Sequence, residues 1–146
     1  MSGPVSGLLV RGLAAAAALV ALAGSAGAES GAVGPVGTWK TATNDEGRYL
    51  HVVIASCSAD PALLCGTVAA AFGGADQSTV GKPILWDMAS EGDGRWSGGR
   101  VWAPDDDNTY RAKMQMKNAA TLELSGCVLG GLICRGQDWT RVAPGG

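Results

Sequence analysis

The sequence is poor in charged residues and has no excess of either sign. Only 16% of its 146 residues are charged, and 11 basic against 13 acidic side chains give a net charge of −2. Such a chain has no basic surface to attract phosphates, so nucleic acid is not expected as a partner. Since 47% of the residues are hydrophobic, the composition still belongs to a folded protein rather than a disordered one.

Groups that usually carry catalysis are also scarce. His51 is the only histidine, and no serine stands in a nucleophile-elbow motif near it. No C-x-x-C motif occurs, which argues against thiol redox chemistry. We therefore expect no enzymatic activity and no cofactor. An enzyme would need His51 in a cleft beside a carboxylate such as Asp87 or Asp138.

The longest uncharged stretch lies near the N-terminus. Arg11 precedes an uncharged run over residues 12–28 that ends in the small residues of a peptidase cleavage site. We interpret residues 1–28 as a signal peptide. A retained transmembrane helix is the alternative, but the strongly apolar part is shorter than the ~20 residues that span a bilayer. No cysteine precedes Cys57, which argues against a lipoprotein anchor.

The remaining chain has the length of one domain. Removing 28 of the 146 residues leaves 118, with 10 basic and 13 acidic side chains and a net charge of −3. We expect a flexible linker over residues 29–35, one domain over residues 36–142 and a short tail over residues 143–146. The mature protein is expected to be a periplasmic or secreted monomer without a membrane span.

The four cysteines form two local pairs, Cys57 with Cys65 and Cys127 with Cys134. An even number in an exported chain indicates disulfides, for which three connectivities are open. The local connectivity is favoured because each pair brackets turn-forming residues. Zinc binding by four thiolates is the alternative, but neither pair has the spacing of two to four residues found in zinc sites.

Alternating hydrophobicity predicts an all-β fold. Beyond residue 30 no segment keeps a helical period, whereas several alternate with a period of two. Gly98-Gly99 interrupts one such pattern and predicts a bulge. Eight strands are expected, over residues 36–41, 49–57, 65–72, 82–88, 95–102, 110–117, 121–128 and 137–142. Eight short antiparallel strands fit a small closed barrel, because closure removes exposed sheet edges; a two-sheet sandwich is the alternative.

A series of short motifs extends over nearly the whole of residues 36–142. These motifs are Gly37-Thr38-Trp39, Leu64-Cys65-Gly66-Thr67-Val68, Val80-Gly81-Lys82-Pro83-Ile84-Leu85, Trp96-x-Gly98-Gly99-x-Val101-x-x-Pro104, Thr109-Tyr110, Gly126-Cys127-Val128-Leu129-Gly130 and Trp139-Thr140-Arg141. Together they resemble domain-of-unknown-function family 2147, small exported bacterial proteins. The resemblance implies a lipocalin-like β-barrel with no established activity and no catalytic residues to transfer.

Two local features qualify this resemblance. Residues 104–108 depart from the Pro-x-Asp/Glu-Gly turn expected there, with Asn108 in the glycine region, and because Asn tolerates the left-handed conformation the turn should survive. A weaker resemblance is to lipocalins proper, in which a Gly-x-Trp on the first strand packs under an Arg from the last. It implies that Trp39 and Arg141 close the barrel by a cation–π contact.

Aromatic and methionine side chains supply the functional hypothesis. If they line the barrel, the protein binds a small apolar or amphipathic molecule; if they only fill it, the protein is an envelope structural or interaction module. The second case would use loop surfaces at residues 73–81 or 105–108. A continuous void of roughly 300 Å³ or more favours binding. The residues expected to contact a ligand are Trp86, Trp96, Trp102, Tyr110, Met114 and Met116.

A metal site is not expected at the acidic run Asp105, Asp106 and Asp107. Three successive carboxylates could in principle hold Ca²⁺, but they lack the ligand spacing of a known calcium loop. The simpler interpretation is a solvated turn between two strands.

Overall fold

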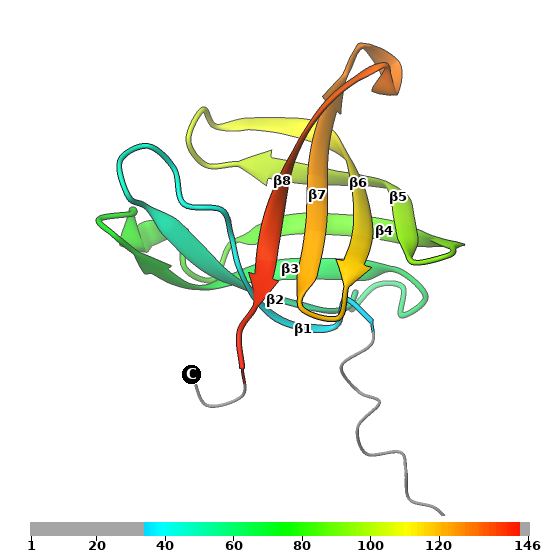
Figure 1. Ribbon diagram of the computed structural model, residues 1–146, viewed down its shortest axis with the longest axis horizontal. Coiled ribbons are helices and arrows are strands. Elements are labelled where there is room, and N and C mark those ends of the chain that lie inside the picture. The colour runs from blue at the N-terminus through cyan, green and yellow to red at the C-terminus, as the bar shows by residue number, and fades with distance from the viewer. Residues whose placement is uncertain (1–33, 144–146) are drawn as a thin grey trace, which may run out of the picture.

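The computed structural model describes residues 34–143 and contains eight antiparallel strands in one closed barrel (Figure 1). The predicted signal peptide, the linker up to residue 33 and the tail from residue 144 lie outside the described residues. The strands are β1 (Gly37–Lys40), β2 (Tyr49–Ser56), β3 (Leu64–Phe72), β4 (Pro83–Gly92), β5 (Arg95–Ala103), β6 (Asn108–Asn118), β7 (Thr121–Val128) and β8 (Ile133–Arg141). The predicted all-β barrel is therefore confirmed.

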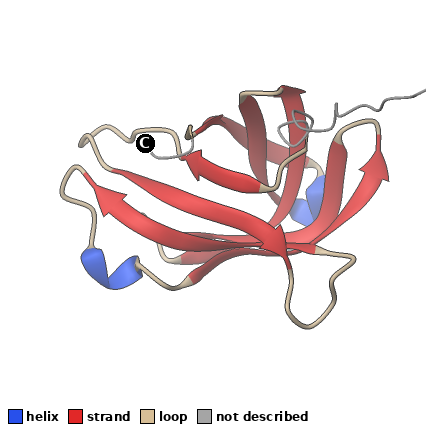
Figure 2. Ribbon diagram, turned by 90° about the horizontal axis from the view of Figure 1, so that it is seen from below, coloured by secondary structure: helices blue, strands red, loops and turns tan. Residues whose placement is uncertain are grey.

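Each strand pairs with the next along the chain, and β8 returns to pair with β1. The closing contact is short, because only Trp39 with Arg141 and Lys40 with Thr140 are in register there. Figure 2 shows the strands curling into a wall, with the two 3₁₀ helices η2 (Gln77–Thr79) and η3 (Leu129–Gly131) in loops between strands. No helix among residues 34–143 is long and apolar enough to cross a membrane.

The predicted bulge at Gly98-Gly99 is present. The pairing of β5 with β6 shifts register between Trp96 and Gly99. A Cβ atom at Gly99 would overlap the backbone carbonyl of Trp86 on β4, so no larger residue fits without moving the strands apart. The bulge lets β5 bend as it follows the wall of the barrel.

Both local disulfides are present as predicted. The Cys57–Cys65 bridge joins the ends of β2 and β3, and the Cys127–Cys134 bridge joins β7 and β8. Because Cys127 and Cys134 are also directly paired across the sheet, β8 begins at Ile133, four residues earlier than the expected start at residue 137. The β7–β8 hairpin consequently projects beyond the rest of the barrel (Figure 1).

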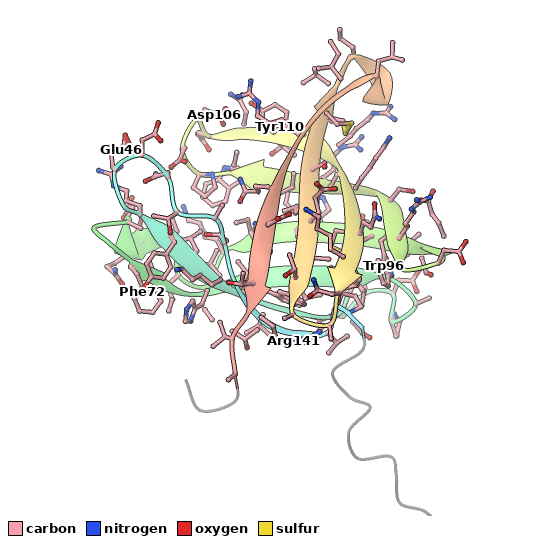
Figure 3. All side chains as sticks on the ribbon, viewed as in Figure 1. Glu46, Phe72, Trp96, Asp106, Tyr110 and Arg141 are labelled. Carbon is pink, nitrogen blue, oxygen red and sulfur yellow. A yellow bond between two sulfur atoms is a disulfide. The ribbon has the colours of Figure 1, made fainter. Side chains whose placement is uncertain are left out.

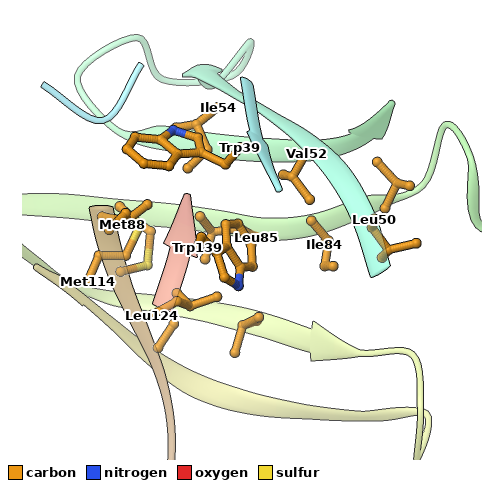
Figure 4. Close-up of a cluster of buried hydrophobic side chains, with 14 residues drawn as sticks. Trp39, Leu50, Val52, Ile54, Ile84, Leu85, Met88, Met114, Leu124 and Trp139 are labelled. Atoms are coloured by element: carbon orange, nitrogen blue, oxygen red, sulfur yellow. The ribbon is translucent and has the colours of Figure 1, made fainter. Parts of the chain in front are cut away.

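The hydrophobic core occupies the barrel interior, where alternate residues of the strands meet (Figure 4). Trp39, Val52 and Ile54 are fully inaccessible to solvent, as are Leu85, Met88 and Leu122. The alternation of buried and exposed residues along β2 and β6 matches the period of two in the sequence. These interior side chains pack the opposite sides of the barrel against each other.

Candidate functional site

The two ends of the barrel differ in their connections. One end, the closed end, has the connections at residues 57–63, 93–94 and 119–120. The other end, the open end, has the loops at residues 41–48, 73–82, 104–107 and 129–132. Candidate binding groups are therefore judged by the end at which they lie.

Trp39 and Arg141 seal the closed end. The Trp39 side chain is fully buried, and its Nε1 donates a hydrogen bond to the carbonyl of Pro35 at 2.8 Å. The guanidinium carbon of Arg141 lies 4.4 Å from the centroid of the indole ring, within cation–π range. Arg141 also donates hydrogen bonds to the carbonyl oxygens of Ala119 and Val36. The cation–π contact expected between Trp39 and Arg141 is therefore present in the structure.

A cavity of about 900 Å³ occupies the open end. It exceeds the roughly 300 Å³ at which a void favours ligand binding. Three loops, at residues 41–48, 73–82 and 104–107, form its rim together with the strand ends at Val128 and Ile133, and buried apolar side chains of the barrel wall form its floor. The floor residues are Leu50, Ile84, Val101, Leu124 and Trp139.

The six residues expected to contact a ligand lie in three places: in the cavity lining, in the core outside the cavity, and, for Trp86, on the outer face. Trp102 and Tyr110 line the cavity and pack against the core. Met114 is buried in the core, and Trp96 and Met116 pack against it, but all three lie outside the cavity lining. They fill the part of the interior nearer the closed end.

The expectation that Trp86 faces inward is wrong. Leu85 is buried opposite Val101, and the next pair in register is Trp86 with the exposed Arg100, which places Trp86 on the outer face. Trp86 is half-buried and does not pack against the core. The physical reason is a local irregularity, since Ile84 and Leu85 are both buried and break the alternation that the prediction assumed.

Sequence reasoning missed the apolar floor of the cavity and the basic side chains of its rim. Trp139 belongs to a quoted motif, and its spacing of two from Gln137 and Arg141 could have placed all three on one face of β8. Leu50 and Leu124 carry the ordinary alternation of a strand and no further signal. The charged rim residues with basic side chains are Arg48, Lys82 and Arg135.

The acidic turn at residues 104–107 forms one side of the rim, and each of its carboxylates accepts a hydrogen bond from a different part of the open end. Asp105 accepts from the Asn44 side chain at 3.4 Å. Asp106 accepts from the Tyr110 hydroxyl at 2.7 Å (Figure 3), and Asp107 accepts from the Trp102 indole at 2.8 Å. The turn is therefore fastened to two aromatic residues of the cavity.

The expected role of Asn108 in this turn needs correction. Asp107, with φ of 54°, takes the left-handed conformation that we assigned to the Asn position. Asp and Asn both tolerate this conformation because their short polar side chains bond locally. Asn108 instead begins β6, and its backbone N–H donates to the Asp106 carboxylate at 3.1 Å.

Hydrogen bonding polarises the Asp106 and Tyr110 pair. The Tyr110 hydroxyl stabilises the charged carboxylate, which lowers the pKa of Asp106 below its ordinary 3.8. The same bond raises the pKa of Tyr110 above its ordinary 10.0, because ionising the hydroxyl would break the hydrogen bond and place a phenolate beside the negative charge of Asp106. Around neutral pH the bond thus joins an ionised Asp106 to a neutral Tyr110.

The rim has charges of both signs. Asp76 caps the short helix η2, accepting a hydrogen bond from the backbone N–H of Ser78 that lowers the pKa of Asp76. The Lys82 ammonium lies 5.4 Å from the centroid of the Trp102 ring. Within residues 34–143 the side chains of Arg48 and Arg135 form no hydrogen bond or ion pair, so their donors face solvent at the rim.

His51 lies on the outer face of β2, away from the cavity. Its ring centroid is 4.6 Å from that of Phe72 and 6.1 Å from that of Tyr49. Of the carboxylates considered with it, Asp138 pairs with Lys117 at 3.0 Å and Asp87 lies beside the Cys57–Cys65 disulfide. The described residues therefore do not bring His51 and these carboxylates into one cleft.

One cluster among the described residues brings potential metal ligands together. A carboxylate oxygen of Asp87 and the sulfur atoms of Cys57 and Cys65 lie within 4.8 Å of one another. The two sulfurs are bonded to each other, so neither is the thiolate that a metal would bind. In this form the cluster offers a single carboxylate.

Comparison with known proteins agrees with this fold. A family model described as an uncharacterized protein conserved in bacteria (DUF2147) matches residues 37–141. The chain belongs to this family. Curated proteins contain no match. Among solved structures, protein HP1028 from the human pathogen Helicobacter pylori, described as belonging to the lipocalin family, is similar with a TM-score of 0.61 and 14% identity. The match covers 76% of this chain and 84% of HP1028, and it shows a shared barrel fold.

Proposed function

We propose that this DUF2147 protein binds one small amphipathic molecule in the cavity at the open end of its barrel. The observation that carries the proposal is the cavity of about 900 Å³, which lies within the range of small-molecule sites. Its floor is apolar and contains the indole of Trp139, whereas its rim carries Arg48, Lys82 and the acidic turn. An apolar body would rest on the floor, with a polar end among the rim groups.

The lipocalin-like fold supports this assignment because eight-stranded barrels can hold one small ligand. We propose binding rather than catalysis, since the single histidine lies on the outer wall. We also propose that the protein is exported to the periplasm or beyond. Two disulfides fit an oxidising compartment, and residues 1–28 have the pattern of a signal peptide.

Binding can be tested with N-phenyl-1-naphthylamine, an uncharged probe whose fluorescence rises in apolar sites. We expect saturable binding by the chain from residue 29 onward, which contains the entire barrel. Ala103→Phe, placed in the cavity lining at the end of β5, should weaken binding about tenfold because the larger side chain occupies the site. Native mass spectrometry and organic extraction of protein purified from its own envelope fraction would identify any natural ligand.

The matched control is Ala55→Phe, an exposed position on the outer face of β2 that lies outside the cavity lining. It should leave probe binding unchanged. Failure of the unmodified protein to bind this probe and a panel of lipids would overturn the proposal and favour the interaction module that uses its loops.

A further inference from the structure

The tip of the β7–β8 hairpin, residues 128–133, is the most exposed apolar surface among the described residues. Leu132 is 85% exposed, Leu129 68% and Ile133 57%. No charged residue occurs between Cys127 and Cys134. A cluster of exposed aliphatic side chains on a projecting element marks an interaction surface rather than ordinary scatter.

The tip is a shaped element, not a loose loop. Leu129, Gly130 and Gly131 all have positive φ, and the backbone N–H of Leu132 donates to the carbonyl of Leu129 at 3.3 Å. A leucine in the left-handed conformation is uncommon. The Cys127–Cys134 disulfide clamps the base of the tip, so its apolar side chains remain presented to solvent.

Basic side chains surround the base of the hairpin tip on both faces. Arg111 on β6 is paired in register with Cys127, on the outer face, and Arg135 on β8 is paired with Gly126, on the cavity side. Lys113 and Arg100 continue the basic outer face, opposite Ser125 and Arg111 respectively. The acidic turn at Asp106 stands lower than the projecting hairpin in Figure 3.

We propose that the hairpin tip docks this protein onto an anionic lipid membrane. With a strand rise of about 3.3 Å per residue, the apex extends roughly 5–10 Å beyond the level of Arg111. That distance equals the depth of about 5–10 Å to which apolar groups enter the headgroup boundary. Leu129 and Leu132 enter this boundary, while Arg111 and Arg135 meet the anionic headgroups.

This docking does not depend on an occupied cavity, but it has a consequence for one. Val128 and Ile133 belong both to the tip and to the cavity lining. A docked tip therefore turns the open end toward the lipid surface, the place from which an amphipathic molecule could enter.

Vesicle co-sedimentation tests the proposal, using the chain from residue 29 onward. We expect binding to vesicles of phosphatidylcholine with phosphatidylglycerol and much weaker binding to phosphatidylcholine alone. The double variant Leu129→Asn, Leu132→Ser should bind roughly tenfold less, since two apolar anchors are removed. Asn is chosen because it tolerates the positive φ at position 129.

Charge variants separate the two contributions. Arg111→Gln with Arg135→Gln should weaken binding to anionic vesicles several-fold and reduce the effect of raising salt from ~0.1 M to ~1 M. Val53→Ser and Arg95→Gln are the matched controls, because both positions are exposed elsewhere on the barrel, and they should bind normally.

Two results would overturn the proposal. One is a tip variant that binds vesicles as tightly as the unmodified protein. The other is an unmodified protein that binds neither kind of vesicle, including the case in which sedimentation velocity shows a dimer that the tip variant dissociates. Probe binding in the cavity is measured separately, so failure of docking and failure of ligand binding are distinguishable.

Discussion

The two ends of the barrel use the same wall for different purposes. Near the closed end, Trp39, Met88 and Met114 belong to the buried core and fill the interior. At the open end the wall encloses about 900 Å³, and small residues such as Ala75, Ala103 and Gly126 stand in its lining. Large side chains fill the barrel near the closed end, and smaller side chains leave space at the open end.

The difference also separates the part of the barrel that stabilises the fold from the part proposed to bind a ligand. Close packing supplies most of the free energy that holds a small domain together, and a cavity forgoes part of it. The closed end offsets this loss of packing energy with the contact between the Trp39 indole and the Arg141 guanidinium and with the Cys57–Cys65 disulfide. The open end is held instead by a hydrogen bond between the loops of Asn44 and Asp105, by the bond from Trp102 on β5 to Asp107, and by the Cys127–Cys134 bridge.

The largest expected effect is at the seal of the closed end. Trp39→Ala should lower the free energy of unfolding by about 3–5 kcal/mol, because a fully buried indole is replaced by a void. Urea denaturation of the chain from residue 29 onward measures it. Trp86→Ala, at a half-buried outer position, should cost about 1 kcal/mol. Equal losses of unfolding free energy in the two variants would contradict the distinction between Trp39 in the core and Trp86 on the outer face.

A matched pair on β7 compares the two halves directly. Leu122 is fully buried near the closed end, whereas Leu124, 5% exposed, borders the cavity. Leu122→Ala should cost about 3–4 kcal/mol and Leu124→Ala about 1–2 kcal/mol, since Leu124 already lacks packing partners on its cavity side. Denaturant melts of both variants give the comparison. A larger loss at Leu124 would mean that the cavity is filled in solution.

Much of this arrangement follows from local patterns in the sequence. The alternation around Met114 predicts its strand and its inward face, and the spacing of Cys57 and Cys65 favours their bridge. The pair Gly98-Gly99 predicts a bulge because it interrupts the strand pattern, and in the structure a side chain at position 99 has no room. These features depend on residues close together along the chain, where sequence reasoning is strongest.

The remaining features depend on contacts between distant segments. In β3 and β4, Leu64 faces Met88 but Gly66 faces Leu85, so two steps along one strand match three along the other. This extra residue on β4 turns Trp86 outward. No local pattern in the sequence predicts the register shift. The rim is similar, because Asn44 and Asp105 lie 61 residues apart in sequence. The position of the cavity likewise emerges only when all eight strands close.

The smallest expected effect concerns how the open end responds to pH. Because the Tyr110 bond lowers the pKa of Asp106, its contribution to the turn is present above the ordinary value of 3.8 and is lost as pH falls through the lower value. The pKa of Tyr110 is raised, so its contribution is present below 10.0 and is lost as pH rises through the higher value. The bond therefore operates across the whole range between them.

Carboxyl ¹³C shifts of Asp106 during a pH titration measure this coupling. Tyr110→Phe removes the donor, so the pKa of Asp106 should rise toward its ordinary value while the closed end is unaffected. Tyr49→Phe changes the only other tyrosine and should leave the titration of Asp106 as it was. If Tyr110→Phe also left it unchanged, the acidic turn would not be fastened to the cavity wall in solution. The contrast between an open end stabilised by hydrogen bonds and a closed end stabilised by packing would then lose its support.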